Sequence, residues 1–333
     1  MTAYRRLIGW TALATLLLIM LGAYVRLSDA GLGCPDWPGC YGKLTPSAAA
    51  GEINQAIASQ GGEHGWVSMS KAWKEMAHRY IATLLGLAII AIAWMAVRYR
   101  QVLQQSPLLA IALVGVVIMQ GLFGKWTVTL LLRPAIVTGH LMGGMLTFGL
   151  LVWLWRRQHA IPRYVDAEPV AALRLPARIA LILLIAQIFL GGWVSTNYAA
   201  LACPDLPTCQ QQWWPETHFS DAFHLFRELG RTADGAGLSI AALTAIHMTH
   251  RLGAIVLTLY LLWLSRRILA LSELRGIGIG LLGVLALQLV LGLSNVYFSL
   301  PLPVAVFHNG GAALLLAVLV VLNFQAFRAR LRF

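Results

Sequence analysis

The stretch GAYVRLSDAGLGCPDWPGC at residues 22–40 returns later in the chain as GGWVSTNYAALACPDLPTC at residues 191–209. Chance does not produce so long a match at a fixed spacing, so the sequence predicts a chain built from two related halves. Eight residues recur at a constant offset of 169: Gly22, Val25, Leu32, Cys34, Pro35, Asp36, Pro38 and Cys40 as Gly191, Val194, Leu201, Cys203, Pro204, Asp205, Pro207 and Cys209.

The repeat continues on both sides of this stretch. His78-Arg79 matches His250-Arg251 at an offset of 172, and three further residues match at 168: Gln120, Gly124 and His140 with Gln288, Gly292 and His308. Because the offset changes, small insertions are expected in the loops. We predict an N-terminal half at residues 1–155, a cytoplasmic linker at 156–176 and a C-terminal half at 177–333.

The composition predicts a membrane protein. Hydrophobic residues make up 59% of the 333-residue chain, charged residues only 11%, and the mean hydropathy is +0.71, whereas a soluble domain carries about 25% charged residues. Four spans in each half would make an all-α fold of two tandem four-helix bundles, related by a pseudo-twofold axis along the membrane normal. Eight apolar runs approach or exceed the ~20 residues that cross a bilayer: 7–26, 73–97, 107–126, 135–155, 177–197, 240–264, 276–298 and 303–325.

The net charge of +12 raises the possibility of nucleic-acid binding, but the basic residues occur in short runs beside the apolar segments, which is typical of membrane topology. With the N-terminus inside, 15 of the 25 basic residues are cytoplasmic, against three acids: Asp166, Glu168 and Glu273. We therefore expect both termini in the cytoplasm. The cytoplasmic bases are Arg5, Arg6, Arg98, Arg100, Arg156, Arg157, Arg163, Arg174, Arg178, Arg266, Arg267, Arg275, Arg328, Arg330 and Arg332.

The first apolar run begins almost directly after the initiating methionine. No transit peptide precedes it and no A-x-A cleavage site obviously follows it, so we expect a retained helix. The expected location is a bacterial plasma membrane.

The four cysteines form two C-P-D-x-P-x-C loops, both expected on the outer side. A disulfide within each loop, Cys34–Cys40 and Cys203–Cys209, suits an oxidising compartment. A metal site would need further ligands, and none recurs in both copies. The disulfides are favoured; whether they are structural or exchange electrons with a partner thiol is left open by the spacing.

Four histidines lie in apolar helical segments, two in each half. His78 and His140 come from the second and fourth spans of the first half, and His250 and His308 from those of the second. A histidine in the membrane is costly and normally marks a site that faces the bundle interior. Two histidines on facing helices can ligate a haem iron from both sides. A core histidine satisfied by a neighbour, or a non-haem metal site, is the alternative.

The halves differ beside the first histidine of each pair. Glu75 precedes His78 by three residues and shares its helix face, whereas His247 takes the equivalent place before His250. We interpret the N-terminal half as the reactive site, with Glu75 as acid/base or as stabiliser of positive charge, and the C-terminal half as an electron-transfer haem site. A glutamate that reaches toward water is the alternative.

Basic side chains near these histidines suggest anion contacts. Arg79 and Arg251 directly follow the ligand candidates and suit a haem propionate, although reaching toward the membrane surface is an equal alternative. Three bases of the first half without basic counterparts are weaker candidates: Arg26, Lys125 and Arg133. The remaining histidines are taken as solvated or left unassigned: His64, His159, His218 and His224.

Five segments together resemble the bacterial heme A synthase family: VRLSDAGLGCPDWPGC, WKEMAHRYIATLLG, GLFGKWTVTLLLRPAIVTGHL, HMTHRLGAI and PVAVFHN. The likeness covers essentially the whole chain. It implies oxidation of the C8 methyl of heme O to a formyl group, giving heme A for terminal oxidases through a hydroxymethyl intermediate. It also implies substrate haem at His78 and His140 and a heme b cofactor at His250 and His308. Glu75 stands at the position of the family's essential glutamate.

The resemblance also predicts partners: heme O as substrate, and heme O synthase and oxidase assembly factors as neighbours. A homo-oligomer is left open. The sequence departs from shorter family members by longer outer segments at 41–72 and 210–237. Three other functions compete: a di-haem b electron-transfer protein that makes no product, a haem exporter or chaperone, and a membrane thiol oxidase.

Overall fold

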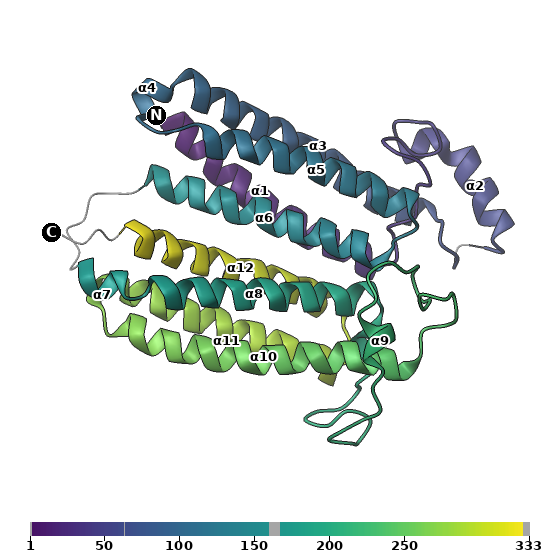
Figure 1. The fold of residues 1–333 in the computed structure, drawn as a ribbon. Coiled ribbons are helices and arrows are strands. Elements are labelled where there is room, and N and C mark those ends of the chain that lie inside the picture. Colours follow the sequence, from purple (N-terminus) through teal and green to yellow (C-terminus); the bar gives the residue numbers. More distant parts are fainter. Residues whose placement is uncertain (1, 63, 160–166, 329–333) are drawn as a thin grey trace.

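The structure is a computed structural model that describes residues 2–62, 64–159 and 167–328. The bases Arg163, Arg330 and Arg332 and the acid Asp166 lie outside these residues. The described chain is all-helical, without strands, and contains eight helices long and apolar enough to cross a membrane. All eight predicted spans are confirmed (Figure 1).

The long helices fall into two groups of four in chain order. The first group is α1 (Thr2–Leu27), α3 (Met69–Arg98), α5 (Leu108–Thr129) and α6 (Pro134–Gln158). The second group is α8 (Arg174–Thr196), α10 (Ile240–Leu269), α11 (Arg275–Tyr297) and α12 (Leu302–Arg328). Short helices fill the connections: η1 (Pro46–Ala49), α2 (Ala50–Ser59), α4 (Arg100–Leu103), α7 (Ala167–Ala171), η2 (Ala199–Leu201), α9 (Phe219–Ala222) and η3 (Ser272–Leu274).

Polar caps define the starts of two long helices. The Ser68 hydroxyl accepts a hydrogen bond from the Lys71 N–H and so starts α3 before the apolar run at 73–97. The Ser239 hydroxyl accepts one from the Ala242 N–H at the start of α10. Each cap satisfies one backbone N–H that the first helical turn leaves free. The two capped helices carry His78 and His250 about three turns from their starts.

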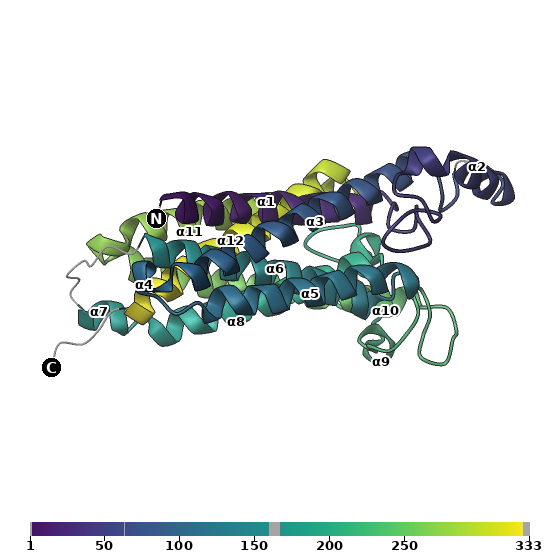
Figure 2. The same ribbon diagram turned by 90° about the horizontal axis from the view of Figure 1, so that it is seen from above.

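Helix contacts follow the same pattern in both groups. In the first group α1 packs on α3 and α6, and α5 packs on α3 and α6; in the second, α8 packs on α10 and α12, and α11 on α10 and α12. The groups meet through α1, α6, α8 and α12 (Figures 1 and 2). This is the contact pattern expected of a pseudo-twofold relation, which stays a prediction, as do the boundaries of the two halves.

Apolar side chains lie both inside and outside the bundle. Fully buried residues such as Ile8, Leu151 and Leu264 form its core. Large apolar residues also cover the outer surface, for example Leu84 at 65% exposure and Leu259 at 63%. A soluble monomer rarely presents so much contiguous apolar surface. The outside of the bundle therefore suits lipid.

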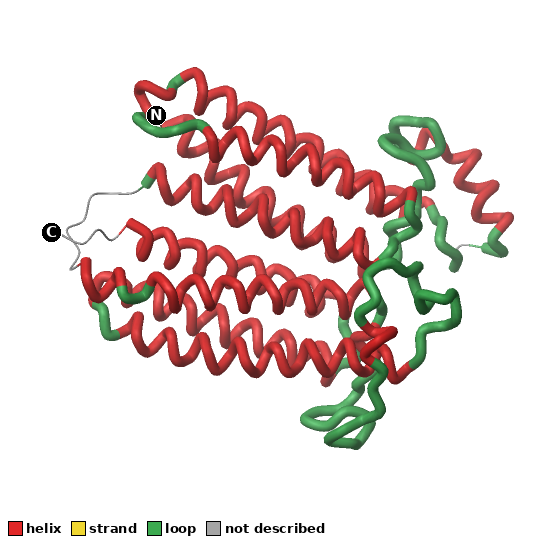
Figure 3. The backbone as a smooth tube through the Cα atoms, viewed as in Figure 1, coloured by secondary structure: helices red, strands yellow, loops and turns green. Residues whose placement is uncertain are grey.

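The two ends of the bundle differ. The described segments next to both termini lie at one end, and the long cysteine-containing loops lie at the other (Figure 3). This is the arrangement that an even number of spans requires. Which end faces the cytoplasm is still the prediction made from the charges.

A cluster on the loop side joins the two groups. Arg26 at the end of α1 donates to the Ser195 carbonyl oxygen at 2.9 Å, and its guanidinium lies 4.1 Å from the centre of the Tyr198 ring. The Tyr198 hydroxyl donates to Asp29 at 2.8 Å. Burial raises the pKa of Tyr198, which keeps this hydroxyl a donor. Both hydrogen bonds join positions 169 residues apart, which are equivalents in the repeat.

Replacing Arg26 by Ala should loosen this junction. A hydrogen bond from a charged donor and a cation–π contact are lost together, so we expect the thermal midpoint in detergent to fall by about 2–4 °C. Arg6→Ala is the matched control, because Arg6 is exposed near the other end of α1. Equal midpoints for Arg26→Ala and the unmodified chain would show that Arg26 does not hold the groups together.

Candidate haem-binding site

His78 on α3 and His140 on α6 face one another. Their ring centres are 6.5 Å apart and the ring planes meet at 73°. A metal–imidazole bond is about 2 Å long. Two such bonds, plus the distance from nitrogen to ring centre in each imidazole, add up to a separation of this size. The pair therefore fits two ligands on opposite sides of one iron.

Both rings remain partly accessible, yet the Nδ1 atom of each is buried without a hydrogen-bond partner among the described residues. The accessible part of each ring therefore lies on its other atoms. A buried ring nitrogen without a partner is costly and marks a site that a ligand completes. In the second group, His250 on α10 and His308 on α12 are likewise partly accessible.

A glycine of a neighbouring helix faces each of the four rings. A Cβ atom at Gly22 on α1 would lie 3.1 Å from His78, and one at Gly191 on α8 would lie 3.1 Å from His250. Gly124 and Gly292 face His140 and His308 in the same way, at 3.6 and 3.0 Å. These glycines leave room for the imidazole rings. Their recurrence in the repeat is explained by this contact.

Glu75 is held between α3 and the first cysteine loop. It is 5% exposed, so it does not reach to water. One carboxylate oxygen accepts a hydrogen bond from the Cys34 backbone N–H at 3.0 Å, and the other pairs with the Arg79 guanidinium. A buried carboxylate needs such partners. The spacing to His78 was noticed in the sequence, but the contact with the loop was not.

Arg79 binds the loop backbone as well as Glu75. Its guanidinium donates to the carbonyl oxygens of Asp36 at 2.8 Å and Gly39 at 2.6 Å. These protein partners were missed in the sequence, since a carbonyl acceptor carries no residue-specific signal. A propionate contact for Arg79 stays a prediction.

The second group repeats this arrangement with a histidine in place of the acid. Arg251 donates through Nε to His247 at 3.2 Å, and its other nitrogens donate to the carbonyl oxygens of Thr208 and Cys203 at 2.8 and 2.9 Å. His247 is 5% exposed. His247 thus helps to position Arg251 on the second loop. Of the two equivalent residues, only Glu75 brings a negative charge.

Each cysteine loop is closed by a disulfide. The Cα atoms are 4.8 Å apart in Cys34–Cys40 and 4.6 Å apart in Cys203–Cys209, and no free cysteine remains. Inside the second loop the Thr208 hydroxyl holds the pKa of Asp205 below its usual value, helped by the backbone N–H groups of Gln210 and Gln211. The charged Asp205 therefore fixes the turn that follows the disulfide.

The longer outer segments pack on these loops. Ile53 of α2 and Ala49 of η1 join the first disulfide, Ala72 and Met76 in one buried cluster. In the other outer segment, the Ala222 carbonyl oxygen of α9 accepts a hydrogen bond from Trp193 Nε1 at 2.8 Å. Both segments thus cover the ends of the helices that carry the site.

Other sequence candidates lie apart from the histidine pairs. Arg26 and Arg133 have protein partners, since Arg133 pairs with Glu228 at 3.7 Å, and Lys125 is exposed. An anion contact for these three bases stays a prediction. Of the remaining histidines, His64, His218 and His224 are exposed, as expected, while His159 contacts the Trp155 carbonyl oxygen.

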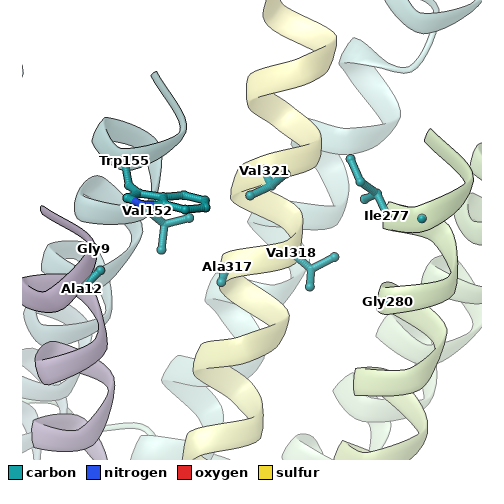
Figure 4. Close-up of a pocket in the computed structure, with 10 residues that line it drawn as sticks. Gly9, Ala12, Val152, Trp155, Ile277, Gly280, Ala317, Val318 and Val321 are labelled. Atoms are coloured by element: carbon teal, nitrogen blue, oxygen red, sulfur yellow. The ribbon is translucent and has the colours of Figure 1, made fainter. Parts of the chain in front are cut away.

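A cavity of about 480 Å³ lies near the end of the bundle that holds the chain termini (Figure 4). Small and apolar residues of α1, α6, α11 and α12 line it, including Gly9, Trp155, Gly280 and Val318. None of the histidines or Glu75 is among its lining residues. Within the described residues, no group of three or more His, Cys, Asp or Glu side chains is placed to hold a metal ion.

The arrangement is that of a polytopic helical membrane protein with two pairs of partly buried histidines. Residues 5–320 match the COX15-CtaA family, described as cytochrome oxidase assembly protein. The chain belongs to this family.

Three relatives show how far the similarity extends. A heme A synthase of Shewanella oneidensis is 43% identical over 316 residues, which cover 94% of each chain. A heme A synthase of Allorhizobium ampelinum is 26% identical over 96% of this chain and 89% of its own. One from Halalkalibacterium halodurans is 27% identical over 67% of this chain and 69% of its own.

Proposed function

We propose that the protein is a heme A synthase of a bacterial plasma membrane, with both termini in the cytoplasm. Its substrate is heme O, whose C8 methyl is oxidised to a formyl group through a hydroxymethyl intermediate. The observation that carries the proposal is the facing pair of His78 and His140 with the buried Glu75 one helical turn away. The 43% identity to a heme A synthase over 94% of both chains supports it.

In this proposal, the N-terminal half binds the substrate. His78 and His140 hold the iron of heme O, and Gly22 and Gly124 leave the two rings free to meet it. Glu75 handles protons or stabilises positive charge as the methyl carbon loses electrons. The Cys34 N–H and Arg79 fix the position of its carboxylate, which is the requirement for an acid/base group.

The C-terminal half holds a heme b cofactor in this proposal, with His250 and His308 as ligands. When bound, heme b supplies a route by which electrons leave the substrate. His247 occupies the place of Glu75, and it supports Arg251 on the second loop rather than adding a negative charge. The difference between Glu75 and His247 thus separates a reactive site from a cofactor site.

The proposal is tested by haem extraction. The chain is produced together with a heme O synthase, and the haems are extracted and separated by chromatography. Heme A and its hydroxymethyl precursor are expected beside heme b. Recovery of heme b alone, although heme O is present, would instead favour a di-haem electron-transfer protein. Bound but unchanged heme O would favour an exporter or chaperone.

The cysteine loop offers a further prediction. Replacing Cys34 and Cys40 together by Ala removes the disulfide, which contributes about 2 kcal/mol to the free energy of unfolding. It also frees the Cys34 backbone N–H that donates to Glu75 to move. We expect heme A formation to fall but to remain measurable, with both haems bound. The equivalent change at Cys203 and Cys209 is the control and should cost less activity. Complete loss of product from the first variant, with haem retained, would support thiol oxidation instead.

A further inference from the structure

Three of the four site histidines share a feature that the fourth lacks. A glycine follows three residues after His140, His250 and His308, and a glutamine from an adjacent helix packs on that glycine. The glutamine–glycine pairs are Gln120–Gly143, Gln187–Gly253 and Gln288–Gly311.

The glutamine amides occupy the space that a side chain at each glycine position would take. In each pair, the glutamine Oε1 atom lies within 3.0 Å of the point where a Cβ atom would stand, so any other residue would displace the amide. Each of these oxygens is also buried without a hydrogen-bond partner among the described residues. A buried amide oxygen without a partner is costly, which indicates that the amides are present for a group that they meet in another state of the site.

The amide nitrogens of Gln187 and Gln288 reach a ring nitrogen of their histidine, whereas that of Gln120 reaches the backbone of His140. Gln187 Nε2 lies 2.9 Å from His250 Nδ1 and 3.0 Å from the carbonyl oxygen of the same residue. Gln120 donates to the His140 carbonyl oxygen at 2.9 Å, and Gln288 Nε2 lies 3.4 Å from His308 Nε2. The amide can rotate to present either its oxygen or its nitrogen. It can therefore accept the N–H of a ligating imidazole, which a metal-bound histidine normally donates to an outer partner.

His78 has neither member of the pair. At the positions equivalent to Gln187 and Gly253 the first half carries Leu18 and Ile81, at offsets of 169 and 172. The Nδ1 atoms of His78, His140 and His308 are all buried without a partner among the described residues, so His78 differs by the missing glutamine and glycine. The repeat thus preserves His78 but omits the glutamine and the glycine that accompany its counterpart His250.

We infer that the three glutamine–glycine pairs hold His140, His250 and His308 as fixed ligands, and that His78 is the ligand that yields when a haem enters or leaves. This inference rests on the proposed function. A synthase must release its product after every turnover, whereas a cofactor haem is retained. One fixed and one yielding ligand suit the first task, and two fixed ligands suit the second.

The test exchanges the two arrangements. The double variant Leu18→Gln with Ile81→Gly installs the missing pair, and Gln187→Leu with Gly253→Ile removes the existing one. Each protein is loaded with heme b in both halves and reduced, and carbon monoxide binding is followed by absorption, because a six-coordinate haem binds it only after an axial ligand leaves. Transfer of haem to apomyoglobin provides a second readout.

In the unmodified protein we expect one of the two haems to react faster. The first variant should slow that haem by about tenfold, and the second should accelerate the other haem by about tenfold, as outer-partner changes commonly do. Gln187→Leu alone serves if the second variant folds poorly, and Gln187→Glu should keep slow reaction because it still offers an acceptor. If two haems are bound but neither double variant changes the rate of carbon monoxide binding, the inference is wrong while the proposed function still stands. Absence of haem from the unmodified chain would overturn the proposed function with it.

Discussion

Replacing Glu75 by Gln should lower heme A formation by about a hundredfold or more while both haems remain bound. The amide keeps the size of the carboxylate and an oxygen that accepts the Cys34 N–H, so the loop stays in place. It loses the negative charge that faces Arg79 and the ability to take up a proton. General acid–base groups contribute about 10²–10⁴-fold to rates.

The measurement is the ratio of heme A to heme O in extracts, with total haem per protein as the second quantity. Glu52→Gln is the matched control, because Glu52 lies exposed on α2 in the outer segment. The control should make heme A at the level of the unmodified chain. Unchanged heme A formation in Glu75→Gln would show that this residue has no catalytic role.

Single alanine replacements at the four site histidines should separate the two halves. His250→Ala or His308→Ala should abolish the absorption spectrum of bound heme b, because the iron loses one of its two proposed axial ligands. His78→Ala or His140→Ala should abolish heme A formation first and leave that spectrum in place. The expected loss of product is at least about a hundredfold, since the substrate iron is no longer held on both sides.

The absorption spectrum of each purified variant is the measurement for this prediction. His218→Ala is the control, because His218 is exposed in an outer loop and its side chain pairs with Asp221. Full heme b in both C-terminal variants would place the cofactor elsewhere. Loss of heme b from the N-terminal variants instead would exchange the roles of the two halves.

The position of Glu75 links the cysteine loop to the haem site. The Cys34 N–H and the Arg79 guanidinium hold the same carboxylate, and Arg79 also binds the loop carbonyl oxygens. A change in the loop therefore reaches the proposed reactive group through two hydrogen bonds. This explains why we expect the cysteine variant to lose activity without any redox role for the disulfide.

The sequence by itself determined the parts of this protein that depend on local chemistry. Eight apolar runs of sufficient length predict eight spans, because transfer of about 20 apolar residues into lipid is favourable wherever they occur. The repeat located the four histidines and the acid, Glu75, that distinguishes the first half beside them. The paired cysteines in an oxidising compartment predicted the loops that the structure closes with disulfides.

Only the tertiary structure decided which groups these residues meet. Arg79 binds carbonyl oxygens and Glu75 binds a backbone N–H, and every residue carries such groups, so no sequence pattern marks the ones that are used. Gln187 reaches His250 from another helix, across 63 positions of the chain. Its contact depends on how α8 and α10 are rotated against each other, and packing of the whole bundle sets that rotation.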